Sequence, residues 1–226
     1  MPRLGKRLLD IARYIPSGSK VADIGTDHAV LPIHLVRCGL ADSAIATDIN
    51  KKPLMKAAEN IDAVGLSDAI ELRLGNGLAC ISPNEIDTIV IAGMGGELIA
   101  DILAAAPWLR NGSYKLILQP MSRSERLREY LAAQHFTPLA ESAGMDAGRH
   151  YTVIVAETSS YSGDYPDFFA YAGLLGQSSI ADDKAYLAYT ADLLRRRAEM
   201  IPQDRRQDGL FCELTAAAEY IEGCLK

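Results

Sequence analysis

Short apolar runs along this chain alternate with stretches in which apolar residues recur at helical spacing. Near the start, leucine and isoleucine side chains recur three or four residues apart until Pro16, which predicts a helix that ends there. Strand and helix signals then alternate over about 155 residues, which is typical of a mostly parallel sheet with helices on both faces. The predicted strands cover 20–24, 43–48, 69–74, 87–92, 114–119, 136–142 and 151–157, and the later predicted helices cover 29–38, 53–64, 97–106 and 124–134.

The end of the chain has a different pattern. After residue 160 the strand signals stop, and two apolar stripes at helical spacing lie on either side of a break at 202–209. Such a pattern predicts an antiparallel, coiled-coil-like helical hairpin. We therefore expect two domains, a sheet domain over 1–160 and a small helical domain over 161–226.

Composition narrows the class of protein. At 226 residues and 49% hydrophobic content, the chain is long enough for one well-buried α/β domain and a small appendage. It has no apolar run of about 20 residues and begins with an amphipathic segment, so we expect a cytoplasmic protein without a membrane partner. The four cysteines form no Cys-x-x-Cys pair, which favours reduced thiols over disulfides or a metal site.

The net charge of −6 argues weakly against a nucleic-acid partner, but the distribution of charge changes that picture. Segments 1–20 and 110–128 each carry five basic residues and one acidic residue. Such segments can hold a polyanion if they share one face, although a solvated helix surface is the alternative for each. Five arginines of the predicted hairpin could help to hold RNA: Arg195, Arg196, Arg197, Arg205 and Arg206.

A turn with a single glycine follows the first predicted strand, in the segment Asp23-Ile24-Gly25-Thr26-Asp27-His28. Nucleotide-binding βαβ units have a tight turn at this point, and an acid after the second strand, here Asp48, accepts hydrogen bonds from ribose hydroxyls. Gly25 is not followed by the further glycines that cradle a pyrophosphate. The pattern therefore favours an adenosine ligand without phosphates, and S-adenosyl-L-methionine is the leading candidate.

Polar turns also follow the other parallel strands, and the carboxyl ends of such strands lie at one edge of a sheet. Three glycines in the segment 93–96 permit close approach of a ligand, and no Lys-Ser or Lys-Thr follows to make a phosphate-binding loop. The predicted cofactor site consists of residues from these turns: Asp23, Gly25, Thr26, Asp48, Ile49, Asn76, Gly77, Gly93, Met94 and Gly95.

Several of these side chains have more than one possible role. Asp23 could hold its turn through backbone N–H groups or reach the ammonium group of the methionine part. Asp48 could merely cap the next helix, and Asn76 could be no more than a turn former. Asp27 and His28 lie at the mouth of the first turn, and we predict that both line the pocket for the methyl acceptor.

Four segments together resemble the bacterial TrmK family of tRNA (adenine-22-N1)-methyltransferases: 23–32, 75–78, 90–96 and 116–120. The resemblance covers about residues 4–157. It implies a Rossmann-like class I methyltransferase that uses S-adenosyl-L-methionine to methylate N1 of an adenine in tRNA. The chain departs from the family pattern at Asp48, where glutamate is usual, at Asn76, where aspartate is usual, and at Met121, where asparagine is usual.

The expected chemistry agrees with these residues. Adenine N1 has a lone pair and no proton, so methylation requires alignment and desolvation more than a strong base, and the product is cationic. Asp27 is the acid best placed to favour that charge, with His28 as an orienting group. The Asn/Asp-Pro-Pro-aromatic motif of exocyclic amino methyltransferases does not follow the fourth strand. Because N1 lies on the Watson–Crick edge, the target base must be unpaired or flipped.

Other functions stay open from the sequence. A nicotinamide-dependent oxidoreductase could use a similar sheet, although the glycine fingerprint is missing, and a noncatalytic RNA-binding module would need no cofactor. A small-molecule methyltransferase would leave the basic segments and the hairpin without a purpose. With tRNA as the expected partner, we predict a monomer or a weak homodimer.

Overall fold

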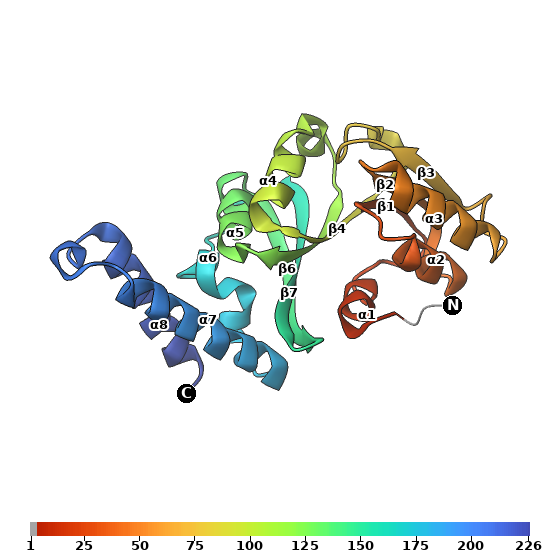
Figure 1. Cartoon of the computed structure of the whole chain (residues 1–226). Helices are drawn as coiled ribbons and strands as arrows, with labels where there is room; N and C mark the ends of the chain where they lie inside the picture. The colour runs from red at the N-terminus through yellow and green to blue at the C-terminus, as the bar shows by residue number, and fades with distance from the viewer. Residues whose placement is uncertain (1–3) are drawn as a thin grey trace.

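A seven-stranded sheet forms the centre of the molecule (Figure 1), and the computed structural model describes residues 4–226. The strand order is β3-β2-β1-β4-β5-β7-β6; the first five strands are parallel, and β7 runs antiparallel to both β5 and β6. The strands are β1 (Ser19–Ile24), β2 (Ala41–Asp48), β3 (Ile70–Leu74), β4 (Thr88–Gly95), β5 (Lys115–Ser122), β6 (Phe136–Asp146) and β7 (Arg149–Ser160).

Helices cover both faces of the sheet because its central strands carry apolar side chains in both directions. Ile89 and Ile91 of β4 belong to the cluster under α4 and α5, whereas Val90 between them belongs to the cluster under α1, α2 and α3. The long helices on the sheet are α1 (Lys6–Ala12), α2 (Val30–Arg37), α3 (Lys51–Asp62), α4 (Gly96–Ala104) and α5 (Ser124–Ala133). Short helical segments are η1 (Pro83–Glu85), η2 (Pro107–Asn111), α6 (Phe169–Ala172), η3 (Gly173–Gln177) and η4 (Gln203–Arg205).

The predicted alternation of strands and helices is confirmed, and the differences lie at the boundaries. Helix α3 begins two residues before Pro53, since proline is tolerated in the first turn of a helix. Strand β4 continues through the glycine-rich turn to Gly95, where Met94 pairs with Pro120 and Gly95 with Ser122 after a shift of register. This extension brings two of the predicted binding turns directly beside each other.

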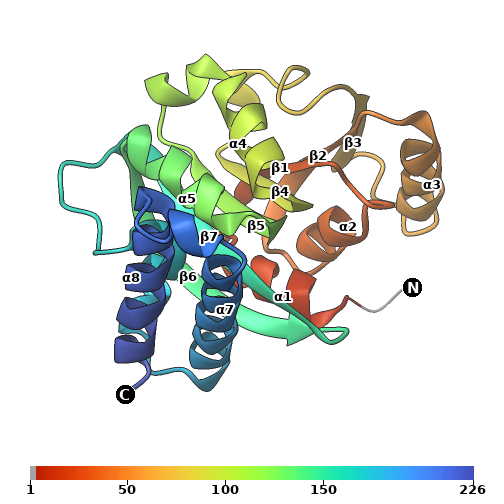
Figure 2. The same ribbon diagram turned by 60° about the vertical axis from the view of Figure 1, so that its left-hand side comes forward.

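The predicted helical hairpin is confirmed as α7 (Ala181–Glu199) and α8 (Gly209–Cys224), which pack around their own apolar cluster. Figure 2 shows the hairpin beside β6 and β7, at the end of the sheet opposite β3. Asp183 at the start of α7 is buried, and its carboxylate accepts hydrogen bonds from the Ala143 amide at 2.7 Å and from the Ser178 hydroxyl at 2.6 Å. The hairpin thus contacts the sheet closely, and the division at residue 160 stays a prediction.

A buried ion pair joins the sheet to the segment that leads into the hairpin. The Arg128 side chain of α5 is fully buried, and its guanidinium donates to the Glu141 carboxylate of β6 at 2.5 Å. Arg128 also donates to the Ala170 carbonyl at 3.0 Å, and Glu141 accepts from the Leu174 amide at 3.0 Å. Four separate elements are therefore held by one pair of opposite charges.

Three members of the two basic segments do not lie on an accessible surface at the predicted site. Arg128 is an internal residue and cannot contact a polyanion. Lys20 and Lys115 lie at the start of β1 and β5, which is the amino edge of the parallel strands and opposite the predicted site. Among the described residues, no helix is long and apolar enough to cross a bilayer, and all four thiols are unbridged.

Replacing Arg128 by methionine leaves the Glu141 carboxylate buried without its cation. We expect the free energy of unfolding to fall by about 3–5 kcal/mol, the range for a buried ion pair broken at one partner. Urea unfolding followed by circular dichroism measures the change. Arg126→Met removes an exposed arginine that pairs with Glu129, and this control should cost less than about 1 kcal/mol. Equal losses in the two variants would contradict the role given to Arg128.

Candidate active site

The turns after the parallel strands meet at one edge of the sheet, as the sequence predicts. The amides of Gly25 and Thr26 both donate to the Thr47 carbonyl of β2 at 2.8 Å. The Gly75 amide donates to the Asp48 carbonyl at 3.0 Å, so the turn after β3 joins the same edge. These backbone hydrogen bonds fix the turns after β1, β2 and β3 relative to one another.

Gly25 is required by the shape of the first turn. Its φ of +75° lies in the left-handed region, and a Cβ at this position would lie 2.1 Å from the Cε atom of Met94. The Met94 side chain therefore packs directly over the turn after β1. The single glycine and the glycine-rich turn, which are far apart in the sequence, form one surface.

Asp23 places a carboxylate inside this surface. Its side chain is 6% exposed, and within residues 4–226 it forms no ion pair and accepts no hydrogen bond from a backbone N–H. Burial raises the pKa of Asp23 from 3.8 to about 6; the neighbouring Thr26 side chain lowers the pKa in part, and the negative charge of Asp27 raises it further. Of the two roles that the sequence left open, this geometry favours binding of a cationic group.

Two buried hydroxyls close to Asp23 also have no hydrogen-bond partner among the described residues. They belong to Thr26, in the turn after β1, and to Thr47, at the end of β2. Buried polar groups in folded proteins almost always have partners. An edge with a buried carboxylate and two unpaired hydroxyls is therefore suited to a polar ligand.

Asp48 is held at the end of β2 by its own turn. One carboxylate oxygen, Oδ1, accepts a hydrogen bond from the Asn50 amide at 2.7 Å, and Asn50 is the residue that precedes α3. Asp48 thus supports the start of this helix, and its Oδ2 atom has no described partner. Ile49 follows with 64% of its surface exposed, which leaves an accessible apolar side chain beside the acid.

The turn after β3 contains Asn76 and Gly77. Gly77 has a φ of +57°, and a Cβ there would lie 3.0 Å from the Cγ2 atom of Ile102 in α4. Asn76 is exposed, and its carbonyl accepts a hydrogen bond from the Ala79 amide at 3.1 Å. Both residues lie where the sequence predicts them, in a turn pressed closely against α4.

Gln119 and Arg7 are site residues that the sequence analysis missed. The Gln119 side chain is completely buried at the end of β5, and its Oε1 atom accepts from the Gly93 amide at 3.1 Å and from the Arg7 guanidinium at 2.6 Å. Its amide group donates to the Pro120 carbonyl at 2.9 Å. Gln119 thereby fixes the turns after β4 and β5 together. The signal that could have found it is a polar residue at the end of an apolar strand, as at Asp23.

Asp27 and His28 lie at the mouth of the first turn. The Asp27 side chain is 90% exposed, and its Oδ1 atom lies 3.3 Å from Nε2 of His28. His28 and Ala29 both adopt left-handed backbone conformations, with φ of 58° and 56°. Such conformations are costly for residues other than glycine and often occur at functional sites. The Asn60 side chain of α3 donates to the His28 carbonyl at 2.9 Å and so holds this loop.

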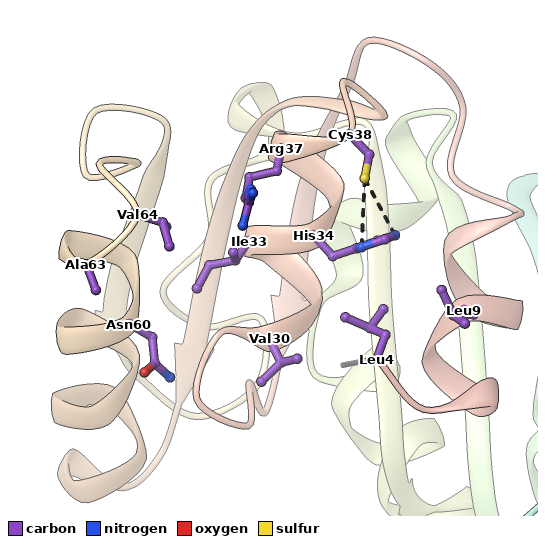
Figure 3. A pocket seen from close by; sticks show the side chains of 10 residues that line it. All are labelled: Leu4, Leu9, Val30, Ile33, His34, Arg37, Cys38, Asn60, Ala63 and Val64. Carbon is purple, nitrogen blue, oxygen red and sulfur yellow. Dashed lines mark hydrogen bonds between the residues drawn. The ribbon is translucent and has the colours of Figure 1, made fainter. Parts of the chain in front are cut away.

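A separate cavity of about 800 Å³ lies between α1, α2 and α3 (Figure 3). Its lining is mostly apolar and includes none of the predicted cofactor-binding residues. His34 lies there on α2, with the Cys38 sulfur 3.8 Å from its Nδ1 atom. This cavity is distinct from the polar edge of the sheet, and size alone does not identify the site.

The strand order, the antiparallel β7 and the polar carboxyl edge together define a class I methyltransferase. Residues 4–154 match the methyltransferase domain family. The chain is 39% identical over 182 residues to the tRNA (adenine(22)-N(1))-methyltransferase of Bacillus subtilis (strain 168), and the match covers 80% of this chain and 76% of that protein. The chain belongs to the TrmK family of tRNA (adenine-22-N1)-methyltransferases.

Solved structures agree over the whole chain. The B. subtilis M1A22 tRNA methyltransferase TrmK has a TM-score of 0.85 and 31% identity, and the match covers 99% of each chain. M. capricolum TrmK in complex with the cofactor product S-adenosyl-homocysteine has a TM-score of 0.82 and 27% identity, with 98% of this chain and 97% of that chain covered. The predicted family and fold class are confirmed, and the oxidoreductase and the noncatalytic module lose their support.

S-adenosyl-L-methionine is the cofactor of this family, and the residues at the strand edge fit it. The Asp23 carboxylate, which is buried and has no ion-pair partner among the described residues, suits the ammonium group, and Asp48 suits the ribose hydroxyls. Gly25, in its left-handed turn, allows close approach of the backbone. The individual contacts of the ten predicted cofactor-binding residues stay predictions.

Asp23→Asn removes a buried negative charge. Because the pKa of Asp23 is raised from 3.8 to about 6 by burial, the folded protein binds the proton more tightly than the unfolded chain. The stability contributed by this group is therefore present at low pH and is lost as the pH rises from about 4 to about 6. We expect D23N to have a higher Tm than the parent at pH 7.5, and this advantage to shrink towards pH 4.

Differential scanning fluorimetry across this pH range measures both melting curves. The exposed Asp42 provides the control variant Asp42→Asn, whose Tm difference from the parent should not depend on the Asp23 titration. If the Tm difference between D23N and the parent were the same at every pH, the charge of Asp23 would not limit stability.

Asp48→Ala removes the proposed ribose acceptor. We expect the affinity for S-adenosylhomocysteine to fall by about 1–3 kcal/mol, the range for a hydrogen bond to a charged group. Isothermal titration calorimetry measures this affinity. Asp48→Glu keeps the carboxylate and introduces the residue that the family pattern favours, so it should retain most of the binding. Unchanged affinity in D48A would mean that Asp48 serves only the turn before α3.

Proposed function

We propose that this chain transfers a methyl group from S-adenosyl-L-methionine to N1 of adenine 22 in tRNA. The observation that carries the proposal is the extent of the similarity to TrmK structures, which covers 99% of the chain and therefore includes the hairpin as well as the sheet. A methyltransferase sheet alone is compatible with many substrates. The shared hairpin supports a shared substrate.

The cofactor supplies an electrophilic methyl group bound to a sulfonium sulfur. Adenine N1 attacks with its own lone pair and has no proton to lose, so the protein does not need a strong base. Its tasks are to hold the acceptor in line, to exclude water and to favour the positive charge of the product. Positioned acidic groups and rigid turns can perform these tasks.

We assign Asp27 and His28 to the pocket for the adenine that accepts the methyl group. Asp27 presents an exposed carboxylate that would favour the developing positive charge on adenine, and His28, 3.3 Å away, would orient it. The Asn60 hydrogen bond fixes the strained backbone that presents both side chains. This arrangement supports a role for the Asp27 carboxylate as a fixed negative charge at the entrance of the cofactor site.

The opposite wall is formed by the turns after β4 and β5. Gln119 ties Gly93 to Arg7, so the glycine-rich backbone keeps one shape while the acceptor base approaches. Met121 follows, where the family pattern favours asparagine, and its Sδ atom lies 3.5 Å from the Gln119 amide nitrogen. A base on this side would therefore meet an apolar side chain and a backbone edge.

The expected partner and location follow from a tRNA substrate. A reaction on tRNA places the protein in the cytoplasm. We assign a monomer or a weak homodimer, because the most exposed apolar side chains are divided between two places: Ile49 and Met55 lie around the start of α3, and Met200 follows α7. Figure 1 shows α3 and α7 at opposite ends of the molecule. A stable homodimer usually needs one contiguous apolar surface.

The proposal is tested by incubating the protein with labelled S-adenosyl-L-methionine and an unmodified tRNA transcript that has adenine at position 22. We expect label in this tRNA, N1-methyladenosine in a nuclease digest analysed by mass spectrometry, and no label in the matched transcript with guanine at position 22. Transfer to both transcripts, or to neither at any salt concentration, would contradict the assigned substrate.

A further inference from the structure

A second cavity, of about 460 Å³, lies between the end of β5 and helix α7. We call it the β5–α7 groove, and its walls come from residues 120–125, 150–152, Tyr171 and one face of α7. Figure 2 shows α7 alongside α5 and the β6–β7 pair, which brings the hairpin next to the carboxyl edge of the sheet. None of the ten predicted cofactor-binding residues lines this groove.

The groove is continuous with the candidate active site. It begins at Pro120 and Met121, directly after Gln119, and Pro120 pairs with Met94 of the glycine-rich turn. Ser122, the next residue of the wall, pairs with Gly95. A strand of RNA that presents a base to this edge therefore passes the mouth of the groove.

Aromatic side chains line the groove on the hairpin side. The rings of His150 and Tyr189 are stacked, with centroids 4.7 Å apart and planes 22° from parallel. Tyr189 is 43% exposed, whereas Tyr171 and Tyr186 are buried, and the Tyr186 hydroxyl lies 3.1 Å from the Ser124 hydroxyl. Tyr189 is thus a rigid, accessible ring backed by a second ring, which suits stacking of a nucleobase.

The charges of the groove suit a phosphate. Arg123 and Arg197 both approach the Glu125 carboxylate, at 3.8 Å and 3.3 Å, and each keeps about half of its side chain accessible. Glu125 is the acidic residue of the described lining. Two guanidinium groups share one carboxylate, so one positive charge remains for a phosphate oxygen.

We propose that the β5–α7 groove binds one unpaired nucleotide of the tRNA next to the adenine that is methylated, with its base stacked on Tyr189 and its phosphate between Arg123 and Arg197. The inference rests on the proposed function. Adenine N1 is accessible only when the target has left its base pair and stack, and its neighbour then loses a stacking partner. Tyr189 supplies a replacement surface that stabilises the opened RNA.

Steady-state kinetics with the adenine-22 transcript test this inference. We expect Tyr189→Ala to raise the KM for tRNA by about five- to a hundredfold, the effect of losing one stacked base. The Kd for S-adenosylhomocysteine, measured by calorimetry, should not change. Tyr189→Phe keeps the ring and should restore the parent KM, whereas a role of the hydroxyl would not give this rescue.

Leu210→Ala changes another exposed side chain of the hairpin, outside the groove, and serves as the matched control with an expected parent KM. Arg197→Gln should lower the slope of log KM against log salt concentration by about 1, the effect of losing one phosphate contact. Two results would contradict nucleotide binding in the groove while the parent still methylates tRNA. One is an unchanged KM in Y189A, and the other is an equal rise of KM in Y189A, Y189F and L210A. No transfer by the parent overturns both proposals.

Discussion

The charge of Asp23, buried at the end of β1, is the constraint on which the active edge depends. A carboxylate in this position is costly unless a cation or hydrogen-bond donors accompany it, and burial raises its pKa to about 6. Gly25 and Met94 close the turn around it, and the described residues bring no basic partner. The protein thus keeps a buried carboxylate without a basic partner among the described residues, and we propose that the ammonium group of the cofactor compensates its charge.

The buried charge of Arg128, unlike that of Asp23, has an ion-pair partner among the described residues. Arg128 is as deeply buried as Asp23, but Glu141, the Ala170 carbonyl and further acceptors satisfy it, and this pair fixes the segment that leads into the hairpin. Asp183 provides a similar contact at the start of α7. Because buried polar contacts have strict geometry, they hold the hairpin at a defined position beside the end of β5. The β5–α7 groove exists as a consequence of that position.

The alternation of strands and helices was predictable from sequence because it depends on local periodicity and on turn residues such as Gly25 and Gly93. The position of Asp48 at the end of β2 was predictable from the apolar run that precedes it, and its contact with the ribose stays a prediction. The contact between Arg7 and Gln119 was not predictable, since it joins residues 112 positions apart, although the place of Gln119 at the end of an apolar strand was a signal for that residue. Arg128 was misplaced for a related reason: the sequence shows a charge but not its burial, and the compensating Glu141 lies on a different element, strand β6. Long-range contacts decided every side chain that sequence reasoning missed or misplaced.

The central claim is that Asp23 and Asp48 hold the two ends of one cofactor at the carboxyl edge of the sheet. A crystal structure of the protein with S-adenosylhomocysteine tests it most directly. The account predicts the amino group of the ligand within hydrogen-bond distance of the Asp23 carboxylate and the ribose hydroxyls on Asp48. A ligand that occupies the cavity between α1, α2 and α3, or that lies at the edge without contacting either acid, would contradict it.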